Sequence, residues 1–121
     1  MRRALLPPPT AAERAAIARA KARLDRLSLY PAPVDVRRVR ILHAPWFFRI
    51  PGYRRYHGYA FRKTILVKSA DPSDDLVTHE LCHIWQSQQR PFHHFWTWLT
   101  TSYRENPYEL EAREAVARTR T

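Results

Sequence analysis

The chain has 121 residues, with 21 basic side chains, 11 acidic side chains and one cysteine. This length fits one domain with one modest core, so we expect a single domain over residues 1–121 and a monomer. The lone Cys82 excludes an intrachain disulfide, which suits a reducing compartment, and no apolar stretch is long enough to span a membrane. We therefore expect a cytoplasmic protein.

The net charge of +10 at pH 7 needs its own explanation. A strongly basic surface attracts nucleic acid, anionic membranes or acidic proteins, or it serves solubility. The basic residues occur along the whole chain instead of in one block, and no motif of a nucleic-acid-binding module is present. We expect the charge to serve solubility and keep nucleic-acid binding as an alternative.

Residues 10–27 have the pattern of an amphipathic helix, which opens with the capping-box residues Thr10 and Glu13. Four apolar residues predict a face that packs on the core: Ile17, Ala20, Leu24 and Leu27. Three basic residues fall on other faces and are expected in solvent: Arg14, Lys21 and Arg23. We interpret residues 1–30 as an N-terminal extension and residues 31–121 as the core of the domain. A cover over a cleft of that core is the alternative role for this helix.

Residues 31–69 predict a small sheet. Residues 36–43 are expected to form a half-buried strand, in which one side alternates with the other: Val39, Ile41 and His43 against Arg38, Arg40 and Leu42. His43 is expected to be a strand residue and not a ligand. Residues 44–56 are crowded with aromatic residues and prolines and predict an irregular loop. Further strands are expected at 59–61 and 64–69, giving about three strands, mostly antiparallel, packed on helices.

Residues 71–90 predict a second helix. Asp71 is expected as its N-cap and Pro72 as its first residue, where the missing N–H of proline costs nothing. Acidic residues follow, which suit the positive end of the helix dipole. Pro91 ends the helix.

This helix contains the sequence His79-Glu80-Leu81-Cys82-His83. Residues four apart lie on one side of an α-helix, so the imidazoles of His79 and His83 converge on one zinc ion. Glu80 is placed to reach a water on that ion and to take up its proton. The simpler alternative is that both histidines make ordinary hydrogen bonds and bind no metal. A structural zinc site in a basic, non-catalytic interaction module is another, but it has no use for Glu80.

A catalytic zinc takes three protein ligands, so a third ligand must come from another segment. Asn106 and Pro107 predict the start of a helix that carries Glu109 and Glu111 in its first turns. A glutamate projecting from this helix towards the histidines would complete the site. A solvated position, paired with a neighbouring arginine, is the alternative for either glutamate.

Segment 91–99 lies between the two predicted metal-bearing helices and is rich in aromatic residues. We expect its aromatic side chains to anchor a helix in the core and to help wall the cleft. Its histidines, His93 and His94, are the rival candidates for the third ligand.

The motif His79-Glu80-x-x-His83, followed by a glutamate on its own helix, resembles the gluzincin class of zinc metallopeptidases, in particular the minigluzincins. The resemblance covers residues 64–117. In gluzincins the third ligand commonly stands in Glu-x-x-Ala, which favours Glu109 over Glu111. Several gluzincins have an aspartate four residues after this ligand, where the chain has Arg113.

SprT-like metalloproteases are the nearest competing family. They share the His-Glu-x-x-His motif, use a downstream histidine and commonly have a pair similar to Leu81-Cys82 between the ligands. Those proteins act near DNA, which would give the positive charge a purpose.

The gluzincin resemblance implies an α+β, zincin-like domain that binds one zinc per chain through His79, His83 and Glu109. It implies hydrolysis of a peptide or protein substrate, with Glu80 as general base. The substrate is expected to lie extended and to pair with an edge strand of the sheet. Three residues are candidates for stabilising the oxyanion: Tyr103, Tyr108 and His93.

Overall fold

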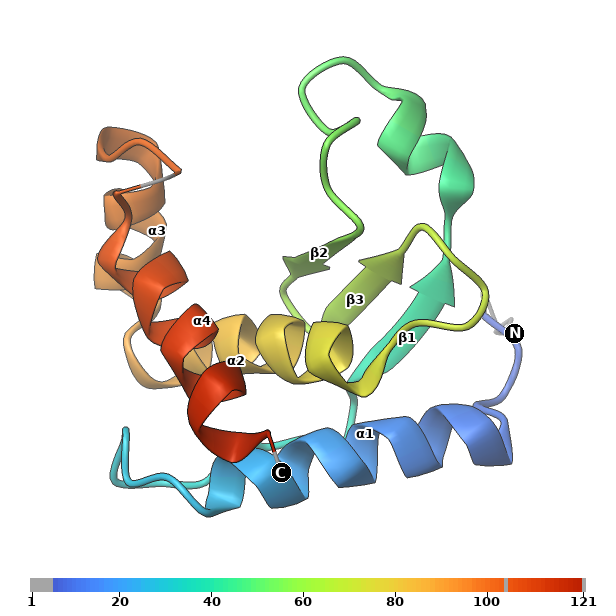
Figure 1. Ribbon diagram of the computed structural model, residues 1–121, viewed down its shortest axis with the longest axis horizontal. Coiled ribbons are helices and arrows are strands. Elements are labelled where there is room, and N and C mark those ends of the chain that lie inside the picture. Colours follow the sequence, from blue (N-terminus) through green and yellow to red (C-terminus); the bar gives the residue numbers. More distant parts are fainter. Residues whose placement is uncertain (1–5, 104, 121) are drawn as a thin grey trace, which may run out of the picture.

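The computed structural model describes residues 6–103 and 105–120. They form an α+β fold (Figure 1). The elements, in chain order, are α1 (Ala11–Asp25), β1 (Arg40–His43), the 3-10 helix η1 (Pro45–Arg49), β2 (Gly58–Phe61), β3 (Thr64–Val67), α2 (Asp74–Gln89), α3 (Pro91–Thr100) and α4 (Pro107–Thr119). No helix within the described ranges is both long enough and apolar enough to cross a membrane.

The three strands form a mixed sheet in the order β1-β3-β2. β1 pairs with β3 in parallel and β2 pairs with β3 in antiparallel, so the expectation of a mostly antiparallel sheet was wrong. The reason is the long connection through residues 44–57 between β1 and β2. Because of this connection, β2 does not lie beside β1 but at the opposite edge of the sheet. The tight β2–β3 turn then places β3 between them, running in the direction of β1. Alternation along a strand identifies the strand but not its neighbours.

Helix α1 packs into the same core as the rest of the chain. Thr10 accepts a hydrogen bond from the N–H of Glu13 at 3.0 Å and caps the helix, as predicted. The predicted apolar face is buried: Ile17, Ala20, Leu24 and Leu27. It packs in one cluster with Ile65 of β3 and with Leu81 and Trp85 of α2. The N-terminal helix therefore shares its core with the region 31–121.

Helix α2 begins two residues later than predicted. Its N-cap is Ser73, whose hydroxyl accepts a hydrogen bond from the N–H of Leu76 at 3.1 Å. The N–H of Asp71 instead donates to the hydroxyl of Ser69, also at 3.1 Å, in the preceding turn. A serine at the cap leaves Asp74 and Asp75 in the first turn, where negative charge is favourable.

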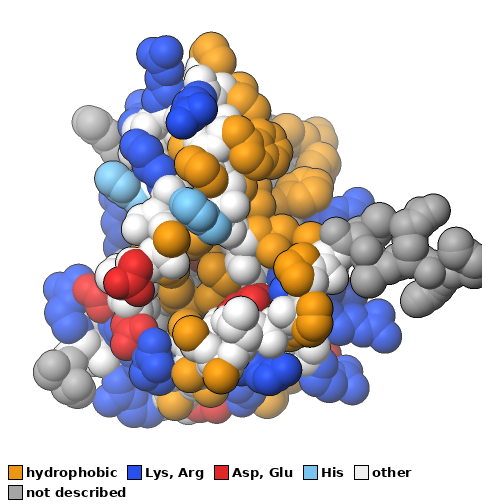
Figure 2. Space-filling view, turned by 90° about the vertical axis from the view of Figure 1, so that its right-hand side faces the viewer, with side chains coloured by type: hydrophobic (Ala, Val, Ile, Leu, Met, Phe, Trp, Pro, Cys, Tyr) orange, Lys and Arg blue, Asp and Glu red, His pale blue; other side chains and the backbone are white. Residues whose placement is uncertain are grey.

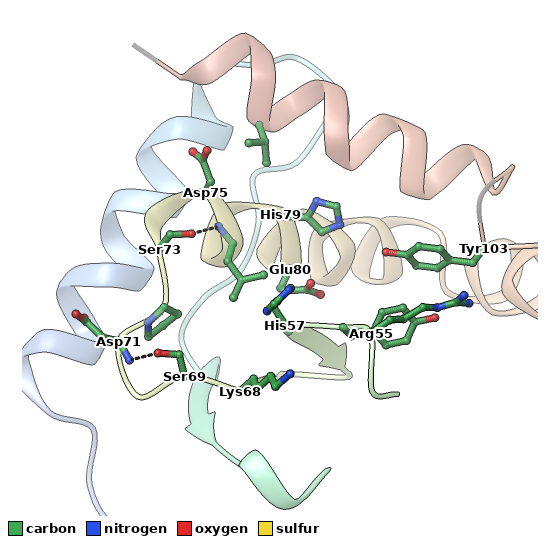
Figure 3. A pocket seen from close by; sticks show the side chains of 15 residues that line it. Arg55, His57, Lys68, Ser69, Asp71, Ser73, Asp75, His79, Glu80 and Tyr103 are labelled. Carbon is green, nitrogen blue, oxygen red and sulfur yellow. Dashed lines mark hydrogen bonds between the residues drawn. The ribbon is translucent and has the colours of Figure 1, made fainter. Parts of the chain in front are cut away.

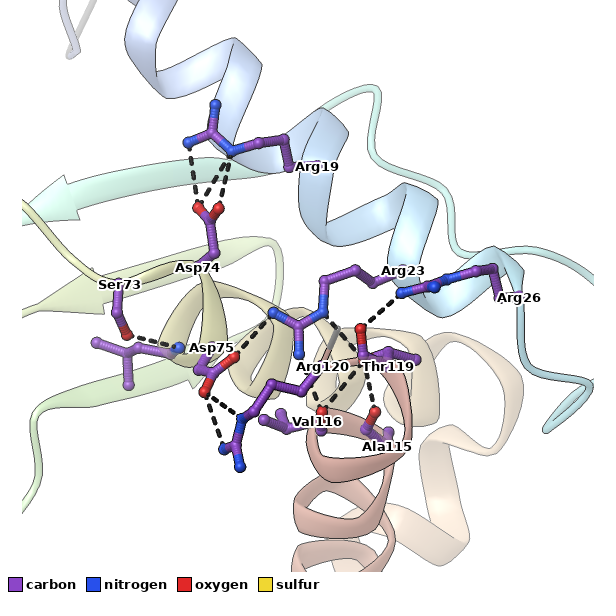
Figure 4. Close-up of polar contacts among 11 residues, drawn as sticks. Arg19, Arg23, Arg26, Ser73, Asp74, Asp75, Ala115, Val116, Thr119 and Arg120 are labelled. Carbon is purple, nitrogen blue, oxygen red and sulfur yellow. Dashed lines mark hydrogen bonds and ion pairs between the residues drawn. The ribbon is translucent and has the colours of Figure 1, made fainter.

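Two arginines of α1 and Arg120, directly after α4, hold the N-terminus of α2 (Figure 4). Arg19 of α1 makes a two-pronged contact with Asp74, at 3.0 and 3.1 Å. Arg23 pairs with Asp75 at 2.9 Å and also donates to the carbonyl of Val116 in α4. The Arg23 side chain is only 15% exposed, so the expectation that it lies in solvent was wrong. These contacts fix α2 relative to α1 and α4.

Helix α3 exposes three of the four aromatic residues that we expected in the core. The fourth, Trp98, is half-buried, and its ring lies 5.4 Å from that of His83. The other large apolar residues of the helix recur at helical spacing along one exposed face: Phe92 (88% exposed), Phe95 (63%), Trp96 (64%) and Leu99 (64%). Within α3, Thr97 is the buried residue. Most of the large apolar side chains of the helix therefore face outwards, the reverse of the usual pattern.

Candidate metal centre

Three side chains converge between α2 and α4. Nε2 of His83 lies 2.9 Å from Oε1 of Glu109, and Nε2 of His79 lies 3.2 Å from the same oxygen. The three potential ligand atoms all lie within 4.8 Å of one another. His83 and Glu109 are buried, whereas the side chain of His79 is 18% exposed. The structure thus brings together the three residues predicted as ligands.

The spacing of these atoms suits a metal ion. Ligands about 2.1 Å from a tetrahedral zinc lie about 3.4 Å from one another. The two nitrogen–oxygen distances of 2.9 and 3.2 Å are close to that separation, so small side-chain shifts would admit an ion. Two imidazoles and one carboxylate also match the donor set of a catalytic zinc site with one open position. The group could therefore hold a metal ion.

Glu109 is held from both sides. Its Oε1 faces the two histidines, and its Oε2 accepts hydrogen bonds from the hydroxyl of Tyr103 at 3.1 Å and from Nε of Arg113 at 2.9 Å. Burial alone would raise the pKa of Glu109, but hydrogen bonds from His79 and His83 outweigh burial and hold this pKa far below its usual range. The carboxylate is therefore ionised and oriented before any ion binds.

His83 is oriented by a buried amide. Its Nδ1 donates to Oε1 of Gln86 at 2.8 Å, which leaves Nε2 facing Glu109. Burial lowers the pKa of His83, but the hydrogen bonds with Glu109 and Gln86 and the charge of Glu80 outweigh it, so the net shift is upwards. A protonated His83 must lose its proton before a metal can bind.

Glu80 lies beside this group without being part of it. The residue is 6% exposed. Burial raises the pKa of Glu80, and the nearby imidazoles of His83 and His79 oppose this rise only in part. A carboxyl group of raised pKa is suited to accept a proton and to release it again.

A cleft of about 740 Å³ opens beside these residues, and His79, Glu80 and Tyr103 line it (Figure 3). On the sheet side its wall includes Gly58 of β2. A Cβ on Gly58 would lie 3.0 Å from Cδ1 of Leu76 and 3.3 Å from Cγ of Glu80. The absence of a side chain therefore lets β2 approach α2 closely at the site.

The described residues of α1 do not line this cleft. Helix α1 packs instead on α2 and α4 through the core and the arginine contacts already described. The alternative role of α1 as a cover over the cleft therefore finds no support in the structure.

The rival ligands lie outside the metal-ligating group. Nδ1 of His93 bonds to the hydroxyl of Tyr108, and Nε2 of His94 accepts from Nε1 of Trp98 at 3.0 Å. Burial and the neighbouring His83 lower the pKa of His94 to about 4. Oε1 of Glu111 accepts from the hydroxyl of Tyr30 at 2.6 Å, on the far side of Gln86.

Sequence reasoning missed two of the partners that hold the ligands in place. Gln86 follows His83 by three residues, a spacing at which helical side chains meet, so it could have been found from the helix pattern. Arg113, four residues after Glu109, was considered as a partner only for a solvated glutamate, and it pairs instead with the buried Glu109. Tyr103 was named only as a candidate for the oxyanion. It reaches Glu109 from the turn between α3 and α4, and no sequence signal indicates that contact.

No protein family model matches the chain, and neither a curated protein nor a solved structure matches it. The resemblance to gluzincins therefore rests on the residues of the site alone.

Proposed function

We propose that the protein is a zinc-dependent metallopeptidase of the gluzincin type with a zincin-like fold. His79, His83 and Glu109 would hold one zinc ion. The observation that carries this proposal is the position of Glu80, a buried carboxyl group that lines the cleft next to His79 and is not needed as a ligand. A site with a purely structural ion has no use for such a group.

Bound zinc would supply Lewis acidity, which activates water and polarises the scissile carbonyl. Glu80 would accept the proton of the attacking water and pass it to the leaving amine. Of the three candidates for stabilising the oxyanion, Tyr103 is the one that lines the cleft.

The sheet supports binding of an extended peptide. β2 is an edge strand of the sheet, and its first residue, Gly58, lines the cleft beside Glu80. An extended substrate can pair with such an edge through main-chain hydrogen bonds. The scissile bond would then lie close to the Glu80 carboxylate.

The experiment compares Glu80→Gln with the unchanged protein. Zinc content by mass spectrometry should stay at about one ion per chain, because Glu80 is not a ligand. Hydrolysis of a diverse peptide library should fall by about a hundredfold or more, the usual contribution of a general base. The exposed Glu114 of α4 provides the matched control, and Glu114→Gln should leave zinc content and activity unchanged.

Two results would count against the proposal. If either His79→Ala or His83→Ala kept its full zinc content, the zinc would not be bound at the proposed site. A zinc-loaded protein that cleaves no peptide of the library would favour the second candidate, a basic interaction module with a structural ion.

A further inference from the structure

Basic residues occur along the whole chain, but the net positive charge is concentrated in one region. Residues 36–70 contain nine of the 21 basic residues and none of the 11 acidic residues. This region therefore carries nine of the ten net positive charges, and it contains all three strands of the sheet. The rest of the chain has 12 basic and 11 acidic residues. A charge that served solubility alone would have no reason to be divided in this way.

Within this region, residues 45–57 form a segment that combines exposed cations with exposed apolar side chains. Trp46 is 62% exposed and Ile50 is 41% exposed. The arginines of the segment are all exposed: Arg49, Arg54 and Arg55. Figure 2 shows hydrophobic side chains gathered with Lys and Arg side chains at the upper end of one face of the molecule.

The other aromatic residues of the segment pack on one another. The ring of Phe47 lies 4.5 Å from that of Tyr53 and 5.4 Å from that of Tyr59 in β2. Phe48 is 2% exposed. The interior of the segment is therefore filled, and the exposure of Trp46 and Ile50 does not result from a loosely folded loop.

We propose that the 45–57 segment docks on an anionic phospholipid surface. Trp46 and Ile50 would enter the interfacial layer, where tryptophan is favoured, while Arg49 and Arg54 bind headgroup phosphates. Charge complementarity selects this partner, because the segment has exposed arginines and no acidic residue of its own. Within the described ranges, neither Arg49 nor Arg54 forms an ion pair that would compete.

Single-stranded nucleic acid fits this surface less well. Proteins that bind it stack successive bases on several exposed aromatic rings. Trp46 is the exposed ring of the segment, because Phe47, Tyr53 and Tyr56 pack against other aromatic residues. Ile50 has no face on which a base could stack. An aliphatic and an indole side chain between arginines match a lipid interface better.

The apolar face of α3 is as exposed as Trp46, but it has no basic residue. Residues 91–100 contain neither lysine nor arginine. No charge complementarity therefore indicates what would cover this face, and we assign no partner to it. The face serves instead as a control for non-specific adhesion of exposed aromatic side chains.

Docking through this segment would place the cleft at the membrane surface. Arg55 and His57, at its C-terminal end, line the cleft together with Glu80. Membrane binding itself does not depend on a metal or on peptidase activity. It can therefore be tested separately from the proposed function.

The test measures co-sedimentation of the full chain with vesicles of equimolar phosphatidylcholine and phosphatidylglycerol, and with vesicles of phosphatidylcholine alone. We expect binding to the mixed vesicles that weakens with salt, and little binding to the neutral ones. Arg49→Gln combined with Arg54→Gln should lower the partition coefficient about 25-fold, at about fivefold for each arginine. Trp46→Ser should lower it about tenfold.

Two matched variants control for these changes. Arg14→Gln combined with Arg118→Gln removes the same charge from exposed positions on α1 and α4 and should cost far less binding. Phe95→Ser replaces a side chain on α3 that is 63% exposed, close to the 62% of Trp46, and should leave binding unchanged. The proposal is overturned if the Arg14/Arg118 control loses as much binding as the Arg49/Arg54 variant, or if Phe95→Ser loses as much as Trp46→Ser. It is also overturned if the protein binds single-stranded DNA or RNA in a salt-dependent way but does not bind the anionic vesicles.

Discussion

Gln86 accepts, through its Oε1, a 2.8 Å hydrogen bond from Nδ1 of His83. This contact fixes the tautomer of His83 and turns its Nε2 towards His79 and Glu109. The orientation of Gln86 is itself fixed, because its Nε2 donates to the carbonyl of Tyr108 at 2.9 Å and to Glu111 at 3.0 Å. The buried amide therefore connects α4 with the histidine pair of α2.

The first prediction concerns this amide. Gln86→Met keeps the length of the side chain but removes its acceptor, so His83 would lose its fixed tautomer. Zinc affinity should fall about 10- to 100-fold, the usual effect of removing a partner that orients a ligand. Competition with a chromophoric zinc chelator measures this change. Gln89→Met, at the end of α2, is the control and should keep the original affinity; equal affinities in all three proteins would contradict a positioning role.

The second prediction concerns the third ligand. Glu109→Gln should weaken zinc binding by more than about a hundredfold, because the amide is a poor ligand for zinc. Glu111→Gln should cost less than about tenfold, since Glu111 contacts Gln86 and not the histidines. His93→Ala and His94→Ala should have similarly small effects. A larger loss from either histidine variant than from Glu109→Gln would support the SprT-like arrangement instead.

The parts of the site that could be predicted are those set by helix geometry. His79 and His83 lie one turn apart on α2, and Asn106 caps α4 as its sequence indicates, with its side chain accepting from the N–H of Tyr108 at 2.8 Å. These relations depend on residues within a few positions of one another. Glu109 could be placed on its helix for the same reason, but its approach to the histidines was an inference from resemblance.

The parts that could not be predicted depend on distant contacts. The capping box is an example: Thr10 caps α1 as expected, but the carboxylate of Glu13 also binds Arg40 and the N–H of Ile41, contacts that no local pattern indicates. The parallel pairing of β1 likewise depends on where the chain goes after residue 43. For α3, the sequence indicated a helix rich in aromatic residues but not whether its apolar side faces the core or the solvent. Helical periodicity is the same for a buried face and for an exposed one.

The third prediction concerns the turn between β2 and β3. Arg62 has a positive φ of 58°, the only such value for a non-glycine residue within the described part of the chain. This left-handed conformation strains an L-residue by about 1–2 kcal/mol, and glycine adopts it freely. After the larger backbone entropy of glycine in the unfolded chain is subtracted, Arg62→Gly should raise the free energy of unfolding by about 0.5–1 kcal/mol. Urea denaturation measures this difference.

Lys63→Gly is the matched control for that turn. Lys63 has no positive φ, so glycine relieves no strain there and only adds entropy to the unfolded chain. It should therefore lower the stability slightly. If both variants changed stability in the same direction and by the same amount, the strain at Arg62 would not be the cause.

The fourth prediction is a dependence of stability on pH, and it comes from the ion pair between Glu13 and Arg40. Their side chains are only 11% and 19% exposed, and Oε2 of Glu13 accepts from Nε of Arg40 at 2.8 Å and from the N–H of Ile41 at 2.9 Å. Burial alone would raise the pKa of Glu13, but these hydrogen bonds outweigh it and bring the pKa below its ordinary value of 4.5. The pair joins the start of α1 to β1.

A carboxyl group whose pKa is lower in the folded state stabilises the fold above its unfolded pKa, and this contribution is lost as the pH falls through the lower, folded pKa. Glu13→Gln should therefore reduce the free energy of unfolding by about 2 kcal/mol at neutral pH, the contribution of hydrogen bonds to a buried charge. The difference from the unchanged protein should shrink steadily once the pH falls below about 4.5. Urea denaturation across this range measures it, with the exposed Glu114→Gln as control. A difference that stays constant down to acid pH would show that Glu13 acts through packing and not through its charge.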